Sequence, residues 1–377
     1  MIVLDKNRVV DNITKRAEDD IATGMIGGAG VLVKQNGETI FRGFFGTADG
    51  EKPLGENSIF RLASMTKPIT AVAALRQMDK GLISLDDTLD KYIPEYAEMQ
   101  IGSFVDGKLK IVGPAKTKIT IKHLLTHSSG LGCGDVGGVY GRIFSPEIEY
   151  DLESATRAYG SRAIAFDPFS AQQYSARMGF DCLARVVEIT SGMTFDKYLQ
   201  KEIFEPLGMV ETTFVPTEEQ WDRVGPPHDR KDDRAIFLPL DREHLFGKLP
   251  LTYFCGGAGL VSTLSDYEKF ADMLLAGGVA ANGERILKEE TVRLMRTPAV
   301  PESIMQDTQR WGLGVRVMVA PTHTGLPLNS YGWSGAYGTH YWVDPDNKIV
   351  AIYLKTSYYD GGAGCRTANN IEKDVYL

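Results

Sequence analysis

Residues 58–78 read SIFRLASMTKPITAVAALRQM, and this stretch decides the fold. Its first residues are typical of a short strand, and the residues after the serine have the apolar spacing of a helix. Ser64 and Lys67 are three residues apart at the start of that helix, so their side chains share a face. A serine hydroxyl is a weak nucleophile unless a neighbouring base takes its proton, and a buried lysine amine can be that base. The spacing therefore predicts that Ser64 is a nucleophile and Lys67 its partner.

The position of Ser64 at the start of a helix adds a second argument. The N-terminus of a helix carries partial positive charge and unpaired backbone N–H groups, which stabilise a developing oxyanion. A Ser-x-x-Lys pattern is nevertheless short enough to occur by chance, and a capped structural helix would look the same. The rest of the chain has to decide between the two interpretations.

The composition is that of an ordinary globular protein. The chain has 377 residues, of which 43% are hydrophobic and 24% charged, enough for one large domain or two interlocked ones. A formal net charge of −8 argues against general affinity for nucleic acid or for an anionic membrane. The first residues show neither a leader pattern nor a long apolar span, so we expect a cytoplasmic protein.

Cysteine and histidine spacing indicates neither a disulfide framework nor a metal site. The cysteines are far apart and lack a Cys-x-x-Cys pattern, so we expect free thiols at Cys133, Cys182, Cys255 and Cys365. The histidines lack the spacing of zinc ligands, and no metal or other cofactor is predicted. We expect His127 to satisfy nearby backbone groups and His340 to face solvent from a strand.

Strand patterns lie at both ends of the chain, and helical patterns lie in the middle. Near the N-terminus, residues 29–43 form two apolar runs around Asn36 and Gly37, the preferred two-residue turn of a β-hairpin. Towards the C-terminus, strands are expected at 312–319, 339–343 and 348–355. The simplest assembly pairs the two ends in one antiparallel sheet.

This order of elements predicts the fold class and the division into domains. The fold class is α+β, with an antiparallel sheet built from both chain ends and flanked by helices, and with a mainly helical inserted domain. We place the sheet domain at residues 1–62 plus 310–377 and the helical domain at residues 63–309. The active site is expected in the cleft between them.

Two further segments carry residues that could complete a catalytic site. Tyr174 lies in a polar, proline-containing loop before a helix, and a tyrosine beside a cation can act as a base. Residues 332–338 read GWSGAYG just ahead of a strand, where glycines let a substrate backbone approach closely. Taken alone, the first segment favours a tyrosine that only packs, and the second favours an ordinary turn.

Together, the three elements resemble the serine hydrolases of the class C β-lactamase and penicillin-binding-protein type, and their motifs are closest to its carboxylesterase branch. The similarity runs through nearly the whole chain and keeps the order of the elements. The matching stretches are 60–67 (FRLASMTK), 124–131 (LLTHSSGL), 174–176 (YSA) and 256–263 (GGAGLVST). The resemblance implies the β-lactamase/transpeptidase-like fold.

The resemblance also implies a role for each candidate site residue. In that family the serine of the Ser-x-x-Lys motif forms an acyl-enzyme, so Ser64 would be the nucleophile. Lys67 and Tyr174 would share the general-acid and general-base work. The backbone N–H groups of Ser64 and Ala336 would form the oxyanion hole. The third motif would contact the substrate through Trp333, Ser334 and Gly335.

The chain departs from the β-lactamase pattern at two positions. Ala176 stands where the second motif of those enzymes has asparagine, and Trp333 stands where their third motif has lysine. These departures remove a partner for an acylamide side chain and a cation for the carboxylate of a β-lactam or peptide. Trp-Ser-Gly is closer to the Trp-Gly-Gly often found in carboxylesterases of this fold, and an indole suits an uncharged group.

We therefore predict a carboxylesterase that hydrolyses short-chain esters through an acyl-enzyme on Ser64. A β-lactamase or a D-amino-acid amidase or peptidase of the same fold is the first alternative, and a non-catalytic ligand-binding module is a remote one. The expected partner is a small-molecule ester or amide, with neither nucleic acid nor a membrane. The sequence leaves the oligomeric state open.

Overall fold

The chain is organised around a seven-stranded antiparallel sheet. The computed structural model describes residues 2–140, 151–246 and 250–377. Neighbouring strands follow the order β2-β1-β13-β12-β11-β10-β9. Their bounds are β1 Gly28–Gln35, β2 Glu38–Gly46, β9 Gln309–Trp311, β10 Arg316–Met318, β11 Tyr331–Ser334, β12 His340–Asp344 and β13 Ile349–Leu354. Both ends of the chain thus meet in one sheet, which confirms the predicted fold class.

The hairpin of β1 and β2 begins the sheet, and β13 joins it to the C-terminal strands. Asn36 and Gly37 have φ values of +54° and +81°, as the predicted two-residue turn requires. On the other side of β1, Leu32 pairs with Ile352 of β13. Strands β1 and β13 are buried on both faces, so their sequences are largely continuous apolar runs and do not alternate between apolar and polar residues.

The prediction of one strand at 312–319 is wrong, because the chain turns there. Strands β9 and β10 form a short hairpin in which Trp311 pairs with Arg316. Gly314 lies in the turn with a φ of +80°, and a β-carbon at this position would come within 2.3 Å of the Ala71 side chain of helix α2 (Thr66–Asp79). Gly314 therefore allows a close approach to α2, and the turn that it forms interrupts the strand.

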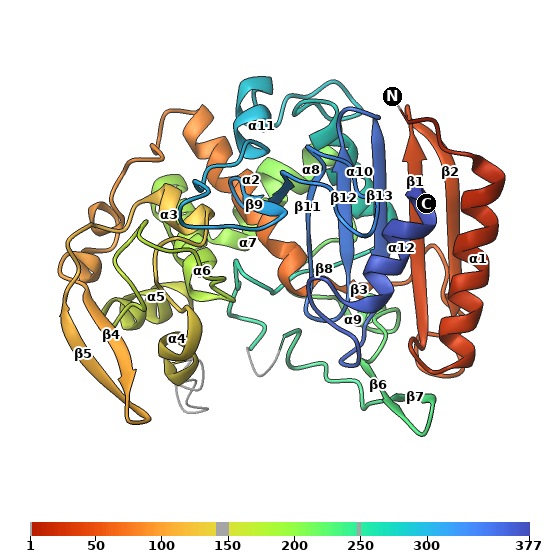
Figure 1. The fold of residues 1–377 in the computed structure, drawn as a ribbon, viewed down its shortest axis with the longest axis horizontal. Coiled ribbons are helices and arrows are strands. Elements are labelled where there is room, and N and C mark those ends of the chain that lie inside the picture. Colours follow the sequence, from red (N-terminus) through yellow and green to blue (C-terminus); the bar gives the residue numbers. More distant parts are fainter. Residues whose placement is uncertain (1, 141–150, 247–249) are drawn as a thin grey trace.

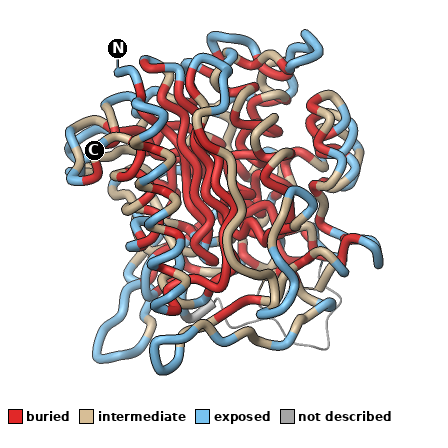
Figure 2. The backbone as a smooth tube through the Cα atoms, turned by 90° about the vertical axis from the view of Figure 1, so that its right-hand side faces the viewer, coloured by how far each residue is buried: buried red, intermediate tan, exposed pale blue. Residues whose placement is uncertain are grey.

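Helices cover both faces of the sheet (Figure 1). The outer face packs against α1 (Lys6–Ala22) and α12 (Arg366–Tyr376), which contribute apolar side chains such as Val9 and Ile371. The inner face packs against α10 (Leu264–Leu275) and belongs to the larger core. Figure 2 shows the central strands buried along their length, with exposed residues at the periphery.

The inserted part is mainly helical, and its core is continuous with that of the sheet. Helix α2 is apolar on nearly all sides and is buried along almost its whole length. It packs against α6 (Met178–Ser191). The apolar stripe of residues 178–190 predicts a helix that ends at Ser191 and Gly192, and α6 ends there, with Gly192 in a left-handed conformation. Because α10 belongs to the insertion and still covers the sheet, the division at residues 62 and 310 stays a prediction.

The remaining elements are short and surround this framework. The mixed charges of residues 230–234 predict a solvated loop, and these residues lie at the tip of the β6–β7 hairpin. The bounds are β3 Phe60–Arg61, η1 Ala63–Met65, η2 Leu89–Lys91, η3 Pro94–Tyr96, β4 Gln100–Val105, β5 Lys108–Pro114, α3 Ile121–Leu125, α4 Gly134–Tyr140, α5 Leu152–Gly160, α7 Phe195–Leu199, η4 Gln200–Phe204, α8 Glu205–Leu207, α9 Glu218–Trp221, β6 His228–Lys231, β7 Arg234–Phe237, β8 Val261–Ser262 and α11 Glu289–Met295. Among the described residues, no helix is both long and apolar enough to span a bilayer.

Buried histidines make the stability of this fold sensitive to acid. Burial is the main cause that lowers the pKa of His123 and of His228 to about 4. An unfolded histidine takes up a proton near pH 6.5, so between pH 6.5 and 4 the unfolded chain binds more protons than the folded one. We expect the free energy of unfolding to fall by about 1–2 kcal/mol per histidine between pH 7 and 5.

Urea denaturation at pH 7, 6 and 5 measures this loss. The His228→Gln variant is the comparison, because it removes one of the buried histidines and should make the pH dependence less steep. A free energy of unfolding that stays constant over this range in the wild type would contradict the expectation.

Candidate active site

Ser64 lies at the point where a strand turns into a helix. Strand β3 pairs with β8, and the chain then passes through η1 into α2. Ala63 adopts a φ of +46°, a left-handed conformation that costs a residue with a β-carbon roughly 1–2 kcal/mol. The turn leaves the Ser64 side chain at the N-terminal end of α2, where it is 8% exposed. Backbone strain directly before a nucleophile is typical of a functional site.

Lys67 is fully buried, and its amino group has three oxygen partners. Nζ lies 3.1 Å from Ser64 Oγ, 2.6 Å from the carbonyl oxygen of Ala176 and 2.7 Å from that of Gly257. Because carbonyl oxygens only accept hydrogen bonds, two N–H groups of Lys67 always point at them. The third position faces Ser64: an ammonium donates a hydrogen bond there, and a neutral amine presents its lone pair. The two carbonyl groups therefore orient the amino group of Lys67 so that the position that can exchange a proton points at Ser64.

The ring of Tyr174 lies next to the amino group of Lys67. The Lys67 Nζ atom lies 5.0 Å from the centre of the Tyr174 ring, within the range of a cation–π contact. The Tyr174 hydroxyl accepts a hydrogen bond of 3.3 Å from the Trp333 indole N–H, which leaves its own proton free to be donated. The structure thus brings Ser64, Lys67, Tyr174 and Trp333, which are far apart in the sequence, to one place.

His127 packs against the loop that carries Tyr174. Its ring centre lies 4.6 Å from that of Tyr174, and its Nδ1 accepts a hydrogen bond of 3.0 Å from the Ser175 N–H. Burial, with a smaller contribution from the positive Lys67, holds the pKa of His127 well below its usual range. The ring is therefore neutral and carries its proton on Nε2. This geometry confirms the expectation that His127 satisfies nearby backbone groups.

The turn after β11 brings Ala336 towards the nucleophile. Thr339 donates a hydrogen bond of 2.9 Å to the carbonyl oxygen of Leu62, two residues before Ser64. The Ser357 N–H holds the Tyr337 carbonyl oxygen at 2.9 Å. Ala336 is exposed, and its N–H has no acceptor among the residues that the structure describes. An unpaired N–H on a tethered turn suits an oxyanion hole, and this role of Ala336 stays a prediction.

The residues of the third motif lie on opposite faces of β11, because side chains alternate along a strand. Trp333 faces inward, with ring centres 4.5 Å from Trp311 and 5.2 Å from Tyr174. Ser334 faces outward, is 2% exposed and lies 2.8 Å from Nδ1 of His340. The Ser334 hydroxyl thus has its partner inside the fold, and the contact of Ser334 with substrate stays a prediction. The prediction that His340 faces solvent is wrong, since it is only 1% exposed.

Sequence reasoning missed the two carbonyl groups that hold Lys67. Gly257 belongs to the stretch 256–263, which was part of the family resemblance and was the available signal. A β-carbon on Gly257 would lie 3.1 Å from the Ala176 carbonyl oxygen. The glycine therefore lets two backbone segments converge on one amino group. Trp311, which lies against both His127 and Trp333, was missed as well, because nothing around it in the sequence marks a site.

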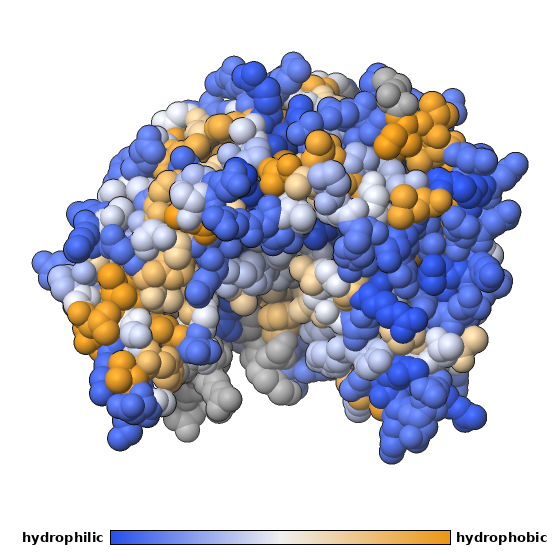
Figure 3. Space-filling view, viewed as in Figure 1, coloured by the Kyte–Doolittle hydropathy of each residue, from blue (hydrophilic) through white to orange (hydrophobic). Residues whose placement is uncertain are grey.

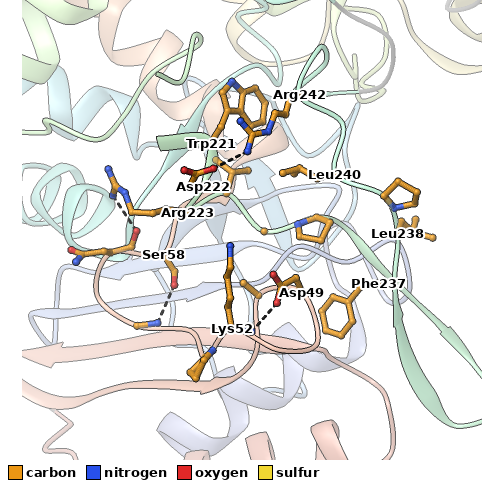
Figure 4. Close-up of a pocket in the computed structure, with 18 of the residues that line it drawn as sticks. Asp49, Lys52, Ser58, Trp221, Asp222, Arg223, Phe237, Leu238, Leu240 and Arg242 are labelled. Atoms are coloured by element: carbon orange, nitrogen blue, oxygen red, sulfur yellow. Dashed lines mark hydrogen bonds and ion pairs between the residues drawn. The ribbon is translucent and has the colours of Figure 1, made fainter. Parts of the chain in front are cut away.

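The surface is hollowed below the lower end of α2, between the parts that carry the β4–β5 and β6–β7 hairpins (Figure 3). A separate cavity of about 730 Å³ lies outside β3, between the loop after β2 and residues 221–242. Lys52 and Ser58 point into this second cavity (Figure 4). Neither Ser64, Lys67 nor Tyr174 lines it, so it is not the place of the chemistry.

Gly335, in the turn after β11, leaves little room for a larger residue. A β-carbon there would come within 2.1 Å of Thr339 Oγ1 and 2.3 Å of the Leu62 carbonyl oxygen. We expect Gly335→Ala to push these atoms apart, to lower the free energy of unfolding by about 1–3 kcal/mol and to remove most turnover. Gly55→Ala is the matched control, because a β-carbon at Gly55 meets nothing within 4 Å.

Denaturant unfolding and covalent labelling of Ser64 by a fluorophosphonate measure the two effects of Gly335→Ala. Normal stability together with a normal labelling rate would show that the turn adapts, contrary to this expectation.

Known proteins are similar to this chain in sequence and in architecture. A family model described as Beta-lactamase matches residues 12–374. The chain is 29% identical over 365 residues to "Esterase EstB" of Burkholderia gladioli, covering 89% of this chain and 88% of that protein. It is 27% identical to "Acyltransferase calJ" of Penicillium decumbens, with 89% of this chain and 84% of that protein covered.

A solved structure gives the same result for the fold. The structure described as "EstCE1, a hydrolase with promiscuous acyltransferase activity" superposes with a TM-score of 0.81. It is 24% identical, and the match covers 99% of each chain. The family match spans nearly the whole chain and includes Ser64, Lys67, Tyr174 and the third motif. The protein belongs to the β-lactamase family and is a serine hydrolase.

Proposed function

We propose that the protein is a carboxylesterase that cleaves short-chain esters through an acyl-enzyme on Ser64. The observation that carries this proposal is the contact of Trp333 with Tyr174. The indole N–H lies 3.3 Å from the tyrosine hydroxyl, at the position where β-lactamases of this family have a lysine. An uncharged, largely apolar group at this place favours a substrate without a carboxylate.

The geometry accounts for acylation of the serine. Lys67, held by the carbonyl groups of Ala176 and Gly257, accepts the Ser64 proton as Oγ attacks the ester carbonyl carbon. The tetrahedral oxyanion is stabilised by the N–H groups of Ser64 and Ala336, and one such donor contributes about 3–4 kcal/mol to lowering the barrier. The alcohol leaves with a proton from the Tyr174 hydroxyl, and Lys67 returns its proton to the tyrosine. Ser64 then carries the acyl group as an ester.

Deacylation runs through the same groups in reverse. A water molecule takes the place of the alcohol. Tyr174 passes its own proton to Lys67 as it accepts a proton from this water, and the hydroxide attacks the acyl carbon. The proton returns through Lys67 to Ser64 Oγ as the carboxylic acid leaves. Because Trp333 donates to the Tyr174 oxygen, it also stabilises the phenolate that exists during the transfer.

Acyl transfer to an alcohol other than water is a second candidate function. The relative from Penicillium decumbens is named an acyltransferase, and the solved neighbour is described as a hydrolase with promiscuous acyltransferase activity. An acyl-enzyme reacts with whichever hydroxyl reaches it, so the same residues support both outcomes. Ester hydrolysis in the presence of a large excess of a second alcohol separates them, because transfer yields a new ester instead of the acid.

The nucleophile is tested with the Ser64→Ala variant. Initial rates are measured on p-nitrophenyl butyrate and on nitrocefin for the wild type and the variant. We expect the wild type to cleave the ester much faster than the cephalosporin and the variant to lose ester cleavage to below one part in about a thousand. Retained ester cleavage in the variant would contradict the nucleophile, and dominant nitrocefin cleavage by the wild type would favour the β-lactamase alternative.

The proton-transfer role is tested with Tyr174→Phe. The variant keeps the ring on Lys67 and His127 but loses the hydroxyl, so kcat should fall at least about a hundredfold with a stability close to that of the wild type. Tyr92→Phe is the control, because the hydroxyl of Tyr92 donates its hydrogen bond to Asp87 in the helical part and not to a candidate catalytic residue. A nearly normal kcat for Tyr174→Phe would leave Lys67 as the sole proton carrier.

A further inference from the structure

The outer face of β11 carries a buried chain of hydrogen bonds that the proposed mechanism does not use. Ser334 Oγ lies 2.8 Å from Nδ1 of His340 on the neighbouring strand β12. Nε2 of the same histidine lies 2.8 Å from Oε1 of Glu372 on helix α12. None of the three residues is more than 3% exposed. We call these three residues the outer relay.

The partners of Glu372, together with the burial of His340, determine which group donates in each hydrogen bond of the outer relay. Arg316 donates 3.0 Å to Oε1, and Thr324 donates 2.6 Å to Oε2. Burial raises the pKa of Glu372, but His340, Arg316 and Thr324 outweigh it and bring the pKa to about 2. The carboxylate is therefore ionised and only accepts, so His340 donates from Nε2. Burial lowers the pKa of His340, so its neutral Nδ1 accepts the Ser334 proton.

Ser334 is the one residue of β11 that lies between two parts of the catalytic site. Trp333, directly before it, donates to the Tyr174 hydroxyl. Gly335, directly after it, starts the turn that carries Ala336. A hydrogen bond on the Ser334 side chain therefore fixes the strand between the tyrosine and the oxyanion turn. A shift of a few tenths of an ångström there would displace both groups.

Ser334 does not form a second catalytic site, although serine, histidine and glutamate follow one another as in a triad. Ser334 is 2% exposed and His340 is 1% exposed, so no substrate reaches the serine oxygen. The serine also donates to a histidine whose second nitrogen is tied to a carboxylate with two further donors. The arrangement is thus a fixed internal contact and not an open nucleophile.

We propose that Ser334, His340 and Glu372 are positioning residues that couple the C-terminal helix α12 to the catalytic face of β11. This inference rests on the proposed function of Ser64 and deepens it. The outer relay holds Trp333 against Tyr174 and holds the Ala336 turn in place during turnover. It also gives a reason for a serine at Ser334, the middle residue of the third motif, because its hydroxyl bonds to the neighbouring strand and not to the substrate.

The experiment compares single and double variants of the relay in the full chain. Ser334→Ala removes the hydroxyl with little change in volume, and His340→Asn breaks both contacts of the ring. We expect each to lower kcat for p-nitrophenyl butyrate roughly tenfold, with KM changed less than twofold. The double variant should be no slower than His340→Asn by more than about twofold, because both changes break one chain. Ser334→Thr, which keeps a hydroxyl, should restore much of kcat.

Tyr376→Phe is the matched control. Its hydroxyl also links α12 to β12, through Trp342 and Asp344, but makes no contact with β11. This variant should lose stability without losing kcat. A fall in kcat as large as that of Ser334→Ala would mean that any loosening of α12 has the same effect, and this outcome would overturn the specific role of the relay.

Two further outcomes would also overturn it. A rise in KM at constant kcat for Ser334→Ala would make Ser334 a substrate contact. Multiplicative effects in the double variant would mean that Ser334 and His340 act independently. The rate of fluorophosphonate labelling of Ser64 is measured for every variant, so that the relay is tested even if no ester proves to be a substrate. A wild type that is not labelled at all would refute the proposed function and the inference together.

Discussion

The burial of a single amino group organises the active site. Lys67 has no exposed surface, and a cationic or amine nitrogen in such a place needs a partner for every N–H group. Two of its three partners are main-chain carbonyl groups from distant segments, at Ala176 and Gly257. These segments must converge on α2 for the chain to fold without an unpaired buried donor. The same convergence leaves one direction of the amino group, and that direction is occupied by Ser64.

Strand β11 then connects this centre to the rest of the molecule. Its inner face contributes Trp333 to the aromatic cluster around Tyr174, and its outer face contributes Ser334 to the contacts beneath α12. The turn that follows is tied by Thr339 to the segment before the nucleophile. A short strand of a large sheet is rigid, so groups that must be placed to within a fraction of an ångström are well carried by it. This arrangement makes the C-terminal helix part of the support of the site.

The sequence predicted the framework because its strongest signals are local. The Asn36-Gly37 turn, the Ser64-x-x-Lys67 pattern and the helix that ends at Gly192 each depend on residues within one turn or one helix, and the structure confirms all three. The position of Tyr174 beside Lys67 was reached only through the resemblance of several motifs in order. Its loop carries no signal that would separate a catalytic tyrosine from one that packs.

The sequence was a poor guide to the direction in which a strand side chain points and to the elements that cover it. Alternation along a strand could not tell that Ser334 points away from the site, nor that His340 is covered by α12, because the covering helix lies about 30 residues further along the chain. The apolar run at 312–319 is broken by a turn at Gly314, where the chain passes close to Ala71 of α2. The sequence by itself predicted the pairing of Ser64 with Lys67 and most of the helices and strands, since both follow from residue type and short-range spacing. Only the tertiary structure decided which carbonyl groups hold Lys67, which face of β11 meets Tyr174 and which meets the C-terminal helix. Those contacts join residues far apart in the chain, and their geometry is set by how the sheet and the helices pack.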